Sequence, residues 1–99
     1  MQFNLYATFR LLAKTKTVSI DLPGGTTVRQ AVNEMIEHLP VLRPHWMDEA
    51  GELYAHVHIF IDGQDAQNLD QGLDTPLQTN SVVDFFPPVG GGSFLGGIL

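Results

Sequence analysis

The chain has 99 residues, 43% of them apolar, which is enough for one globular domain with a single modest core. Eleven acidic side chains against five basic ones give a net charge of −6, which disfavours nucleic acids and anionic membranes as partners because both are negative themselves. The absence of cysteine excludes a disulfide framework, a thiolate nucleophile and a cysteine zinc site. A partner with a basic docking surface fits this composition better.

The start of the chain carries no signal for export or membrane insertion. Met1-Gln2-Phe3 is not part of a basic segment followed by an apolar one, and no apolar run approaches the ~20 residues that a membrane helix needs. We therefore expect a cytoplasmic protein that has no membrane among its partners.

The first part of the chain predicts two strands. Polar and apolar residues alternate from Gln2 to Phe9 and again from Thr17 to Leu22, and Pro23-Gly24-Gly25 ends the second run. Leu11 and Leu12, in the connection, are expected to tuck under the sheet edge. Because the two strands lie close in sequence, we predict a hairpin.

A helix is predicted next. Thr27 and Gln30 have the spacing of a capping box, in which each residue bonds the backbone N–H of the other. Apolar residues then recur at steps of three and one, as expected for one face of an amphipathic helix: Val28, Ala31, Val32, Met35, Ile36 and Leu39. Pro40 stops the pattern. This helix should lie across one face of the sheet.

The second half predicts loops and short strands. Residues 41–53 are expected to be irregular, with one helical turn at most, and residues 57–61 form an apolar strand. Asp62-Gly63 is a strong tight-turn signal, after which residues 64–68 allow only a short return strand. Ser81 to Phe86 is predicted to be the final strand.

Candidate chemical residues are few. His56 and His58 lie two apart on a predicted strand and could share a face, but no third metal ligand of suitable spacing accompanies them, so we favour surface histidines and no metal. Met35 and Trp46 are expected to pack in the core. No Ser/His/Asp arrangement or paired carboxylate site stands out, and we predict no catalytic residues and no enzymatic activity.

The most distinctive motif is the run from Phe85 to Gly92, Phe-Phe-Pro-Pro-Val-Gly-Gly-Gly. Its prolines stiffen the chain and cannot donate to a sheet, and its glycines remove every side chain, so it predicts a thin arm leaving a folded body. Taken alone it could be an ordinary linker. The motif becomes more specific in combination with three other segments of the chain, which are Leu5 to Ala13, Phe60 to Gly63 and Leu73 to Leu77.

Together these segments resemble the ubiquitin-like sulfur carriers (MoaD/ThiS-like), which include the small subunit of molybdopterin synthase and relatives in thiamine and cysteine biosynthesis. The resemblance covers nearly all of Gln2 to Gly92. It implies an α+β fold, a β-grasp roll with a mixed sheet of four to five strands and one main helix packed across it. In this family the first and last strands are parallel neighbours. The implied organisation is a domain over residues 1–89 and a Gly-rich tail over residues 90–99.

The resemblance also implies a chemistry. Such a protein ends in a glycine whose carboxylate is adenylated with ATP by a ubiquitin-activating-like enzyme and converted to a thiocarboxylate, which donates sulfur to a synthase. The carrier itself binds no cofactor, and ATP belongs to the activating partner. Aligning Pro87 and Pro88 with the family places the working pair at Gly91 and Gly92, with Gly90 in the arm. An exposed apolar patch on the sheet face away from the helix is expected to provide recognition.

The chain departs from the family pattern because it continues from Ser93 to Leu99. We favour a precursor that a peptidase cuts between Gly92 and Ser93. A cut after Gly97, at a second diglycine, is an alternative, and so is a permanent apolar tail that makes the protein an interaction module. A processed form could also be a protein modifier joined to lysines, and the sequence does not choose between these activities or name the sulfur-containing product.

Overall fold

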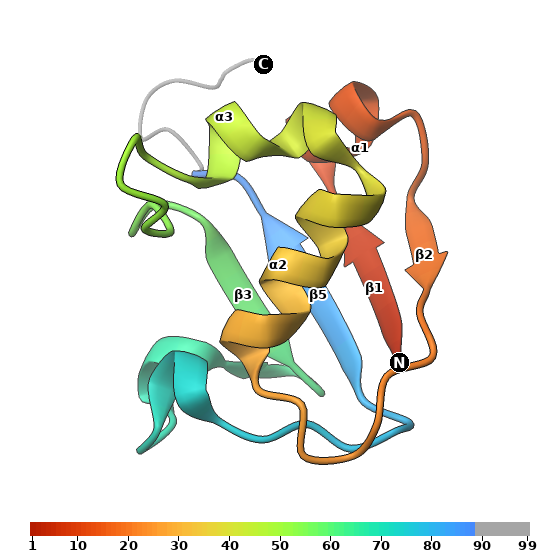
Figure 1. Cartoon of the computed structure of the whole chain (residues 1–99), viewed down its shortest axis with the longest axis vertical. Helices are drawn as coiled ribbons and strands as arrows, with labels where there is room; N and C mark the ends of the chain where they lie inside the picture. The colour runs from red at the N-terminus through yellow and green to blue at the C-terminus, as the bar shows by residue number, and fades with distance from the viewer. Residues whose placement is uncertain (89–99) are drawn as a thin grey trace.

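The computed structural model describes residues 1–88 and contains a five-stranded mixed sheet with the strand order β2-β1-β5-β3-β4 (Figure 1). The strands are β1 (Gln2–Leu5), β2 (Thr17–Ser19), β3 (His58–Ile61), β4 (Gln64–Asp65) and β5 (Val82–Phe86). β1 and β5 pair in parallel, and the other neighbours are antiparallel. This arrangement confirms the predicted α+β β-grasp fold, with the last strand in the centre of the sheet.

The remaining elements cover one face and the ends of the sheet. The helices are α1 (Ala7–Ala13), α2 (Val28–His38) and α3 (Arg43–Trp46), and the 3-10 helices are η1 (Pro40–Leu42), η2 (Ala66–Asn68) and η3 (Gly72–Asp74). α2 crosses the sheet, and α1 and α3 lie near one end of it (Figure 1). No helix within residues 1–88 is long and apolar enough to span a membrane.

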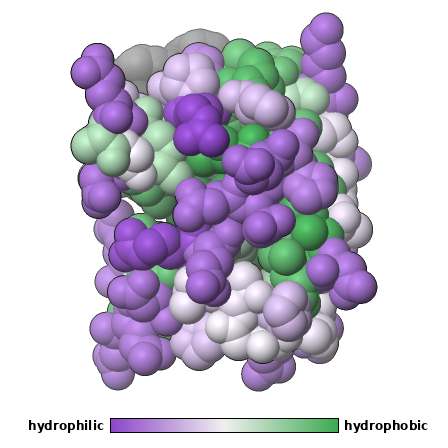
Figure 2. All heavy atoms as spheres, viewed as in Figure 1, coloured by the Kyte–Doolittle hydropathy of each residue, from purple (hydrophilic) through white to green (hydrophobic). Residues whose placement is uncertain are grey.

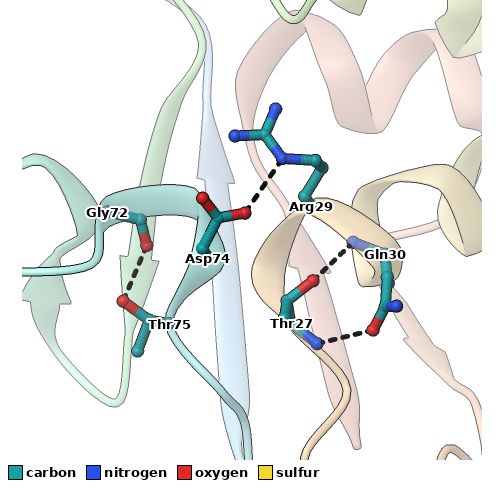
Figure 3. Close-up of polar contacts among 6 residues, drawn as sticks. All are labelled: Thr27, Arg29, Gln30, Gly72, Asp74 and Thr75. Carbon is teal, nitrogen blue, oxygen red and sulfur yellow. Dashed lines mark hydrogen bonds and ion pairs between the residues drawn. The ribbon is translucent and has the colours of Figure 1, made fainter.

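α2 forms as its sequence predicts. The Gln30 N–H donates to Thr27 Oγ1 at 3.2 Å and the Thr27 N–H donates to Gln30 Oε1 at 3.0 Å, which completes the capping box (Figure 3). Its apolar stripe is buried except for Leu39, which ends the helix and is half-buried. Across its middle, the surface on the α2 side is largely hydrophilic (Figure 2).

The core lies between α2 and the sheet. Alternate residues of the three middle strands point into it and are buried: Phe3, Leu5, Ile59, Ile61, Val83 and Phe85. Trp46, at the end of α3, stacks on Phe85 with ring centroids 4.5 Å apart and meets Phe9 edge-on at 5.6 Å. Trp46 and Met35 are both fully buried, which confirms that they pack in the core.

The predicted first strand is too long. β1 ends at Leu5, the Tyr6 N–H donates to the Phe85 carbonyl at 3.2 Å, and Ala7 then adopts a φ of 51° and begins α1. Phe9 is buried as expected, but from a helix. The prediction that Leu11 tucks under the sheet edge is wrong as well, because 75% of the surface of Leu11 is exposed. β1 and β2 therefore pair antiparallel across a helix and not through a simple hairpin turn.

Boundaries elsewhere differ less. β2 stops at Ser19, three residues before its predicted end, although Ile20 is buried. The Asp62-Gly63 turn is confirmed, with φ values of 49° and 88° that match the left-handed geometry of a tight hairpin. The irregular segment after α2 contains η1 and the single helical turn α3.

Candidate functional site

The base of the predicted arm lies at the end of the central strand. β5 is bonded to β1 on one side and to β3 on the other, and its last residues are paired on different sides, Phe85 with Leu5 of β1 and Phe86 with His58 of β3. Pro87 and Pro88 follow, half-buried and exposed respectively. Gly90, Gly91, Gly92 and Ser93 lie outside the described residues, so the arm, the working glycines and the cleavage junction stay predictions.

Three aromatic side chains gather on the sheet face away from α2. The ring of Phe86 stacks on that of Tyr6, with centroids 4.2 Å apart and planes 12° from parallel. Phe60 meets Phe86 edge-on at 5.5 Å. These three residues, which we call the aromatic cluster, remain partly accessible, and Tyr6 keeps 37% of its surface exposed.

A hollow of about 520 Å³ opens beside this cluster. Its lining residues come from four segments and extend from the end of β5 along β3 to the β3–β4 turn: Ala7, His58, Phe60, Gly63, Asp84, Phe86, Pro87 and Pro88. Most of the lining is apolar, and the last two described residues form part of it. An apolar patch is therefore present on the face where it was expected, immediately next to the start of the arm.

A polar network borders the cluster. Asp84 Oδ1 accepts hydrogen bonds from Asn4 Nδ2 at 2.8 Å and from the Tyr6 hydroxyl at 3.2 Å. Asn4 Oδ1 in turn accepts from Thr17 Oγ1 at 3.0 Å and from Gln2 Nε2 at 3.1 Å. The network thus crosses from β5 through β1 to β2 and fixes the orientation of the Tyr6 ring.

The surroundings of the Tyr6 hydroxyl shift its pKa. Partial burial raises its pKa above the usual value, and the negative charge of Asp84 and the hydrogen bond to that carboxylate raise it further. The pairing of Tyr6 with Asp84 was not predicted from the sequence. The alternation of polar and apolar residues in β1 and β5 could have indicated it. Asn4 and Asp84 each lie between two core residues and must therefore face the open side of the sheet.

The Leu73–Leu77 segment of the sequence motif has a structural role. Arg29 Nε donates to Asp74 Oδ1 at 3.1 Å, and the Thr75 hydroxyl donates to the Gly72 carbonyl at 2.7 Å (Figure 3). The Val28 N–H donates to the Thr75 carbonyl at 3.1 Å. The segment therefore holds the first turn of α2 and lies away from the arm residues Pro87 and Pro88.

The histidine pair does not have the geometry expected from the sequence. β3 begins at His58, and His56 lies in the preceding turn, where it stacks on Tyr54 at 4.9 Å. His58 lines the hollow. Within residues 1–88, no group of three or more histidine, aspartate or glutamate side chains is placed to hold a metal ion.

A β-grasp domain whose central strand leads into a proline and glycine arm defines the class of ubiquitin-like proteins. Within that class, the chain belongs to the ThiS family, whose sequence model matches residues 3–92. The resemblance noted from the motifs is thereby confirmed. The family consists of small β-grasp sulfur carriers and protein modifiers, and residues 93–99 lie outside the match.

Individual relatives agree with this assignment. Small archaeal modifier protein 1 of Haloferax volcanii is 29% identical over 92 residues, which cover 93% of this chain and all of the relative. Small archaeal modifier protein 3 of the same organism is 27% identical, over 93% of this chain and 98% of the relative. The crystal structure of SAMP1 from Haloferax volcanii superposes with a TM-score of 0.82 at 28% identity, covering 92% of this chain and 97% of that one.

Proposed function

We propose that this protein is a sulfur carrier that works through the carboxylate of Gly92 after residues 93–99 have been removed. A partner enzyme adenylates this carboxylate with ATP, and a sulfur nucleophile then displaces AMP to leave a thiocarboxylate. The observation that carries the proposal is the position of Pro87 and Pro88, which follow the central strand beside an open apolar hollow and precede Gly91-Gly92 in the sequence.

The arm suits this chemistry because glycine has no Cβ. A glycine backbone can enter a narrow active site and leave its carbonyl open to attack, where a side chain would obstruct both. In the uncut chain the Gly92 carbonyl belongs to an amide with Ser93, which has no carboxylate oxygen to attack ATP. A peptidase that cuts after Gly92 is therefore a required partner.

The folded body supplies recognition in this proposal. The aromatic cluster and the hollow offer an apolar surface, and the net charge of −6 favours partners with a basic docking surface. The partners are an activating enzyme and, after sulfur loading, a synthase that accepts the sulfur. The need for ATP agrees with a cytoplasmic location.

Protein modification is the second candidate, and the relatives called small archaeal modifier proteins favour it. The activation step is the same in both cases. The two functions separate at the acceptor, which is a sulfur nucleophile for a carrier and a lysine amine for a modifier.

The test uses the chain ending at Gly92, incubated with ATP and a desalted lysate of its own organism supplemented with sulfide, followed by intact-mass measurement. A carrier gains the mass difference between sulfur and oxygen at its C-terminus. A modifier appears instead in higher-mass adducts with an isopeptide bond to lysine.

Two controls sharpen this test. The same chain with Gly92→Val should show neither product, because the added side chain obstructs activation. The full chain should gain sulfur only after losing residues 93–99. Absence of both products from the chain ending at Gly92, under conditions that activate another family member, contradicts the proposed function.

A further inference from the structure

The hollow beside the aromatic cluster has no occupant among residues 1–88. It is about 520 Å³ in volume, within the ~300–1,000 Å³ typical of ligand pockets, and Phe60 and Phe86 present ring surfaces to it. Apolar surface of this kind on a small acidic protein is a site for an apolar partner. Because Asp84 lies in the lining, a negatively charged partner is disfavoured.

The described part of the chain ends at this hollow. Pro87 and Pro88 line it, and the next residue along the chain is Val89. Phe94 follows Pro88 by six residues, which span at most about 20 Å when extended. The intervening segment contains three consecutive glycines, whose permissive backbone allows the chain to reverse direction. Residues after Gly92 can therefore return to the hollow.

The chemistry of the tail matches the lining. Residues 93–99 read Ser-Phe-Leu-Gly-Gly-Ile-Leu, with four large apolar side chains and no charged one. Phe94 supplies a ring that can pack against Phe60 and Phe86, since aromatic pairs gain from offset or edge-on contact. A short tether also raises the effective concentration of such a segment to the millimolar range.

We propose that the apolar tail of the uncleaved chain, residues 94–99, binds in this hollow, with Phe94 and Leu95 against the aromatic cluster. The tail then covers the recognition surface at the base of the arm. Removal of residues 93–99 exposes this surface in the same step that creates the Gly92 carboxylate. The second consequence rests on the proposed function, whereas the contact itself does not.

The contact can be measured by NMR on the isotopically labelled full chain. We expect nuclear Overhauser effects between the side chains of Phe94 or Leu95 and the rings of Phe60 or Phe86. The double substitution Phe94→Ser and Leu95→Ser should abolish them and shift the backbone amides that line the hollow, while amides under α2 stay in place.

Substitutions in the body provide matched variants. Phe60→Ser removes one wall of the hollow and should release the tail, with amide dispersion confirming that the domain is folded. Leu11→Ser removes a side chain that is 75% exposed and lies outside the hollow, so it should leave the tail contacts intact.

Two results overturn the inference. One is the absence of contacts between tail and hollow, together with identical hollow amide shifts in the full chain and its double variant. The other is contacts that disappear on dilution, because they would place the tail in the hollow of a second copy. If either occurs while the chain ending at Gly92 still acquires sulfur, tail binding fails and the proposed function stands. If the contacts are present but Gly92 is not activated, tail binding stands and the proposed function fails.

Discussion

Trp46 is fully buried between Phe85 and Phe9, yet its indole Nε1 has no hydrogen-bond partner within residues 1–88. A buried indole N–H normally finds a partner, and leaving it without one costs free energy. The stabilising contribution of this side chain therefore comes from its apolar surface and from ring stacking.

Substitution at Trp46 should separate these contributions. Trp46→Ala should lower the free energy of unfolding by about 3–5 kcal/mol, because it leaves a large cavity. Trp46→Phe keeps a ring against Phe85 and removes the unpaired N–H, so it should cost less than half as much. Urea denaturation followed by circular dichroism measures both. Equal losses for the two variants would mean that a ring stacked on Phe85 adds no stability at this position, contrary to the geometry.

The Tyr6 and Asp84 pair makes a prediction about pH. The pKa of Tyr6 is raised above its ordinary value of about 10, so the folded protein holds the phenolic proton more tightly than the unfolded chain does. The stability that this provides is complete below about pH 10 and is lost as the pH rises through the folded-state pKa.

Asp84→Asn should lower the pKa of Tyr6 without returning it fully to the ordinary value, since partial burial remains after the charge is gone. The measurement is a tyrosinate absorbance titration in a Tyr54→Phe background, which leaves Tyr6 as the only tyrosine. An unchanged pKa would show that the Asp84 carboxylate does not act on the Tyr6 hydroxyl.

The N-terminus of α2 is held by two sets of contacts, the capping box and the hydrogen bonds from the Leu73–Leu77 segment. Thr27→Ala should reduce the free energy of unfolding by about 1 kcal/mol through loss of the cap. Arg29→Ala should cost less, because Arg29 and Asp74 are more than half exposed and such ion pairs contribute little.

Thr79→Ala is the matched control for this helix, because Thr79 is exposed and its hydroxyl makes no hydrogen bond to another described residue. Thermal unfolding of the three variants ranks them. A loss for Thr79→Ala as large as that for Thr27→Ala would mean that the cap adds nothing beyond a generic threonine effect.

Local patterns predicted α2, the Asp62-Gly63 turn and β5, because caps, turn residues and periodicity act over a few positions. α1 could not be found this way. The alternation of β1 continues through Phe9, and what ends the strand is the positive φ of Ala7 at the point where Tyr6 bonds the Phe85 carbonyl. That bond joins residues far apart in sequence. Tyr6 also provides no side-chain cap, so the sequence has no local motif that predicts the start of the helix.

The candidate site was predictable in part for the same reason. Pro87, Pro88 and the apolar patch follow from the motif and the alternation of β5. The stacking of Tyr6 on Phe86, and the hydrogen bonds of Asp84 to Asn4 and Tyr6, depend on the parallel pairing of β1 with β5. Only the assembled sheet brings those side chains together.

The charge of the whole protein leads to a prediction about partner binding. With a net charge of −6, association with an activating enzyme that has a basic surface should be accelerated at low ionic strength, and the rate should fall roughly tenfold when salt screens the charges. Stopped-flow measurement of association at several salt concentrations tests this.

The loop after α3 offers a variant for that experiment. Glu49 and Glu52 are exposed, whereas Asp48 accepts hydrogen bonds from the N–H groups of Ala50 and Glu52 and shapes the loop. The double substitution Glu49→Gln and Glu52→Gln should slow association and flatten its salt dependence. If association does not depend on salt even in the unsubstituted chain, apolar contact alone governs the encounter.

The parallel pairing of β1 with β5 has a consequence for biosynthesis. The pair joins positions 80 residues apart, such as Asn4 and Asp84, and β5 is also the neighbour of β3. While the ribosome is still translating, β1 and β3 have no strand between them, and the core lacks Val83 and Phe85. Folding must therefore wait until Phe86 has left the exit tunnel. The peptidase that we propose would consequently meet a finished domain and not a nascent one.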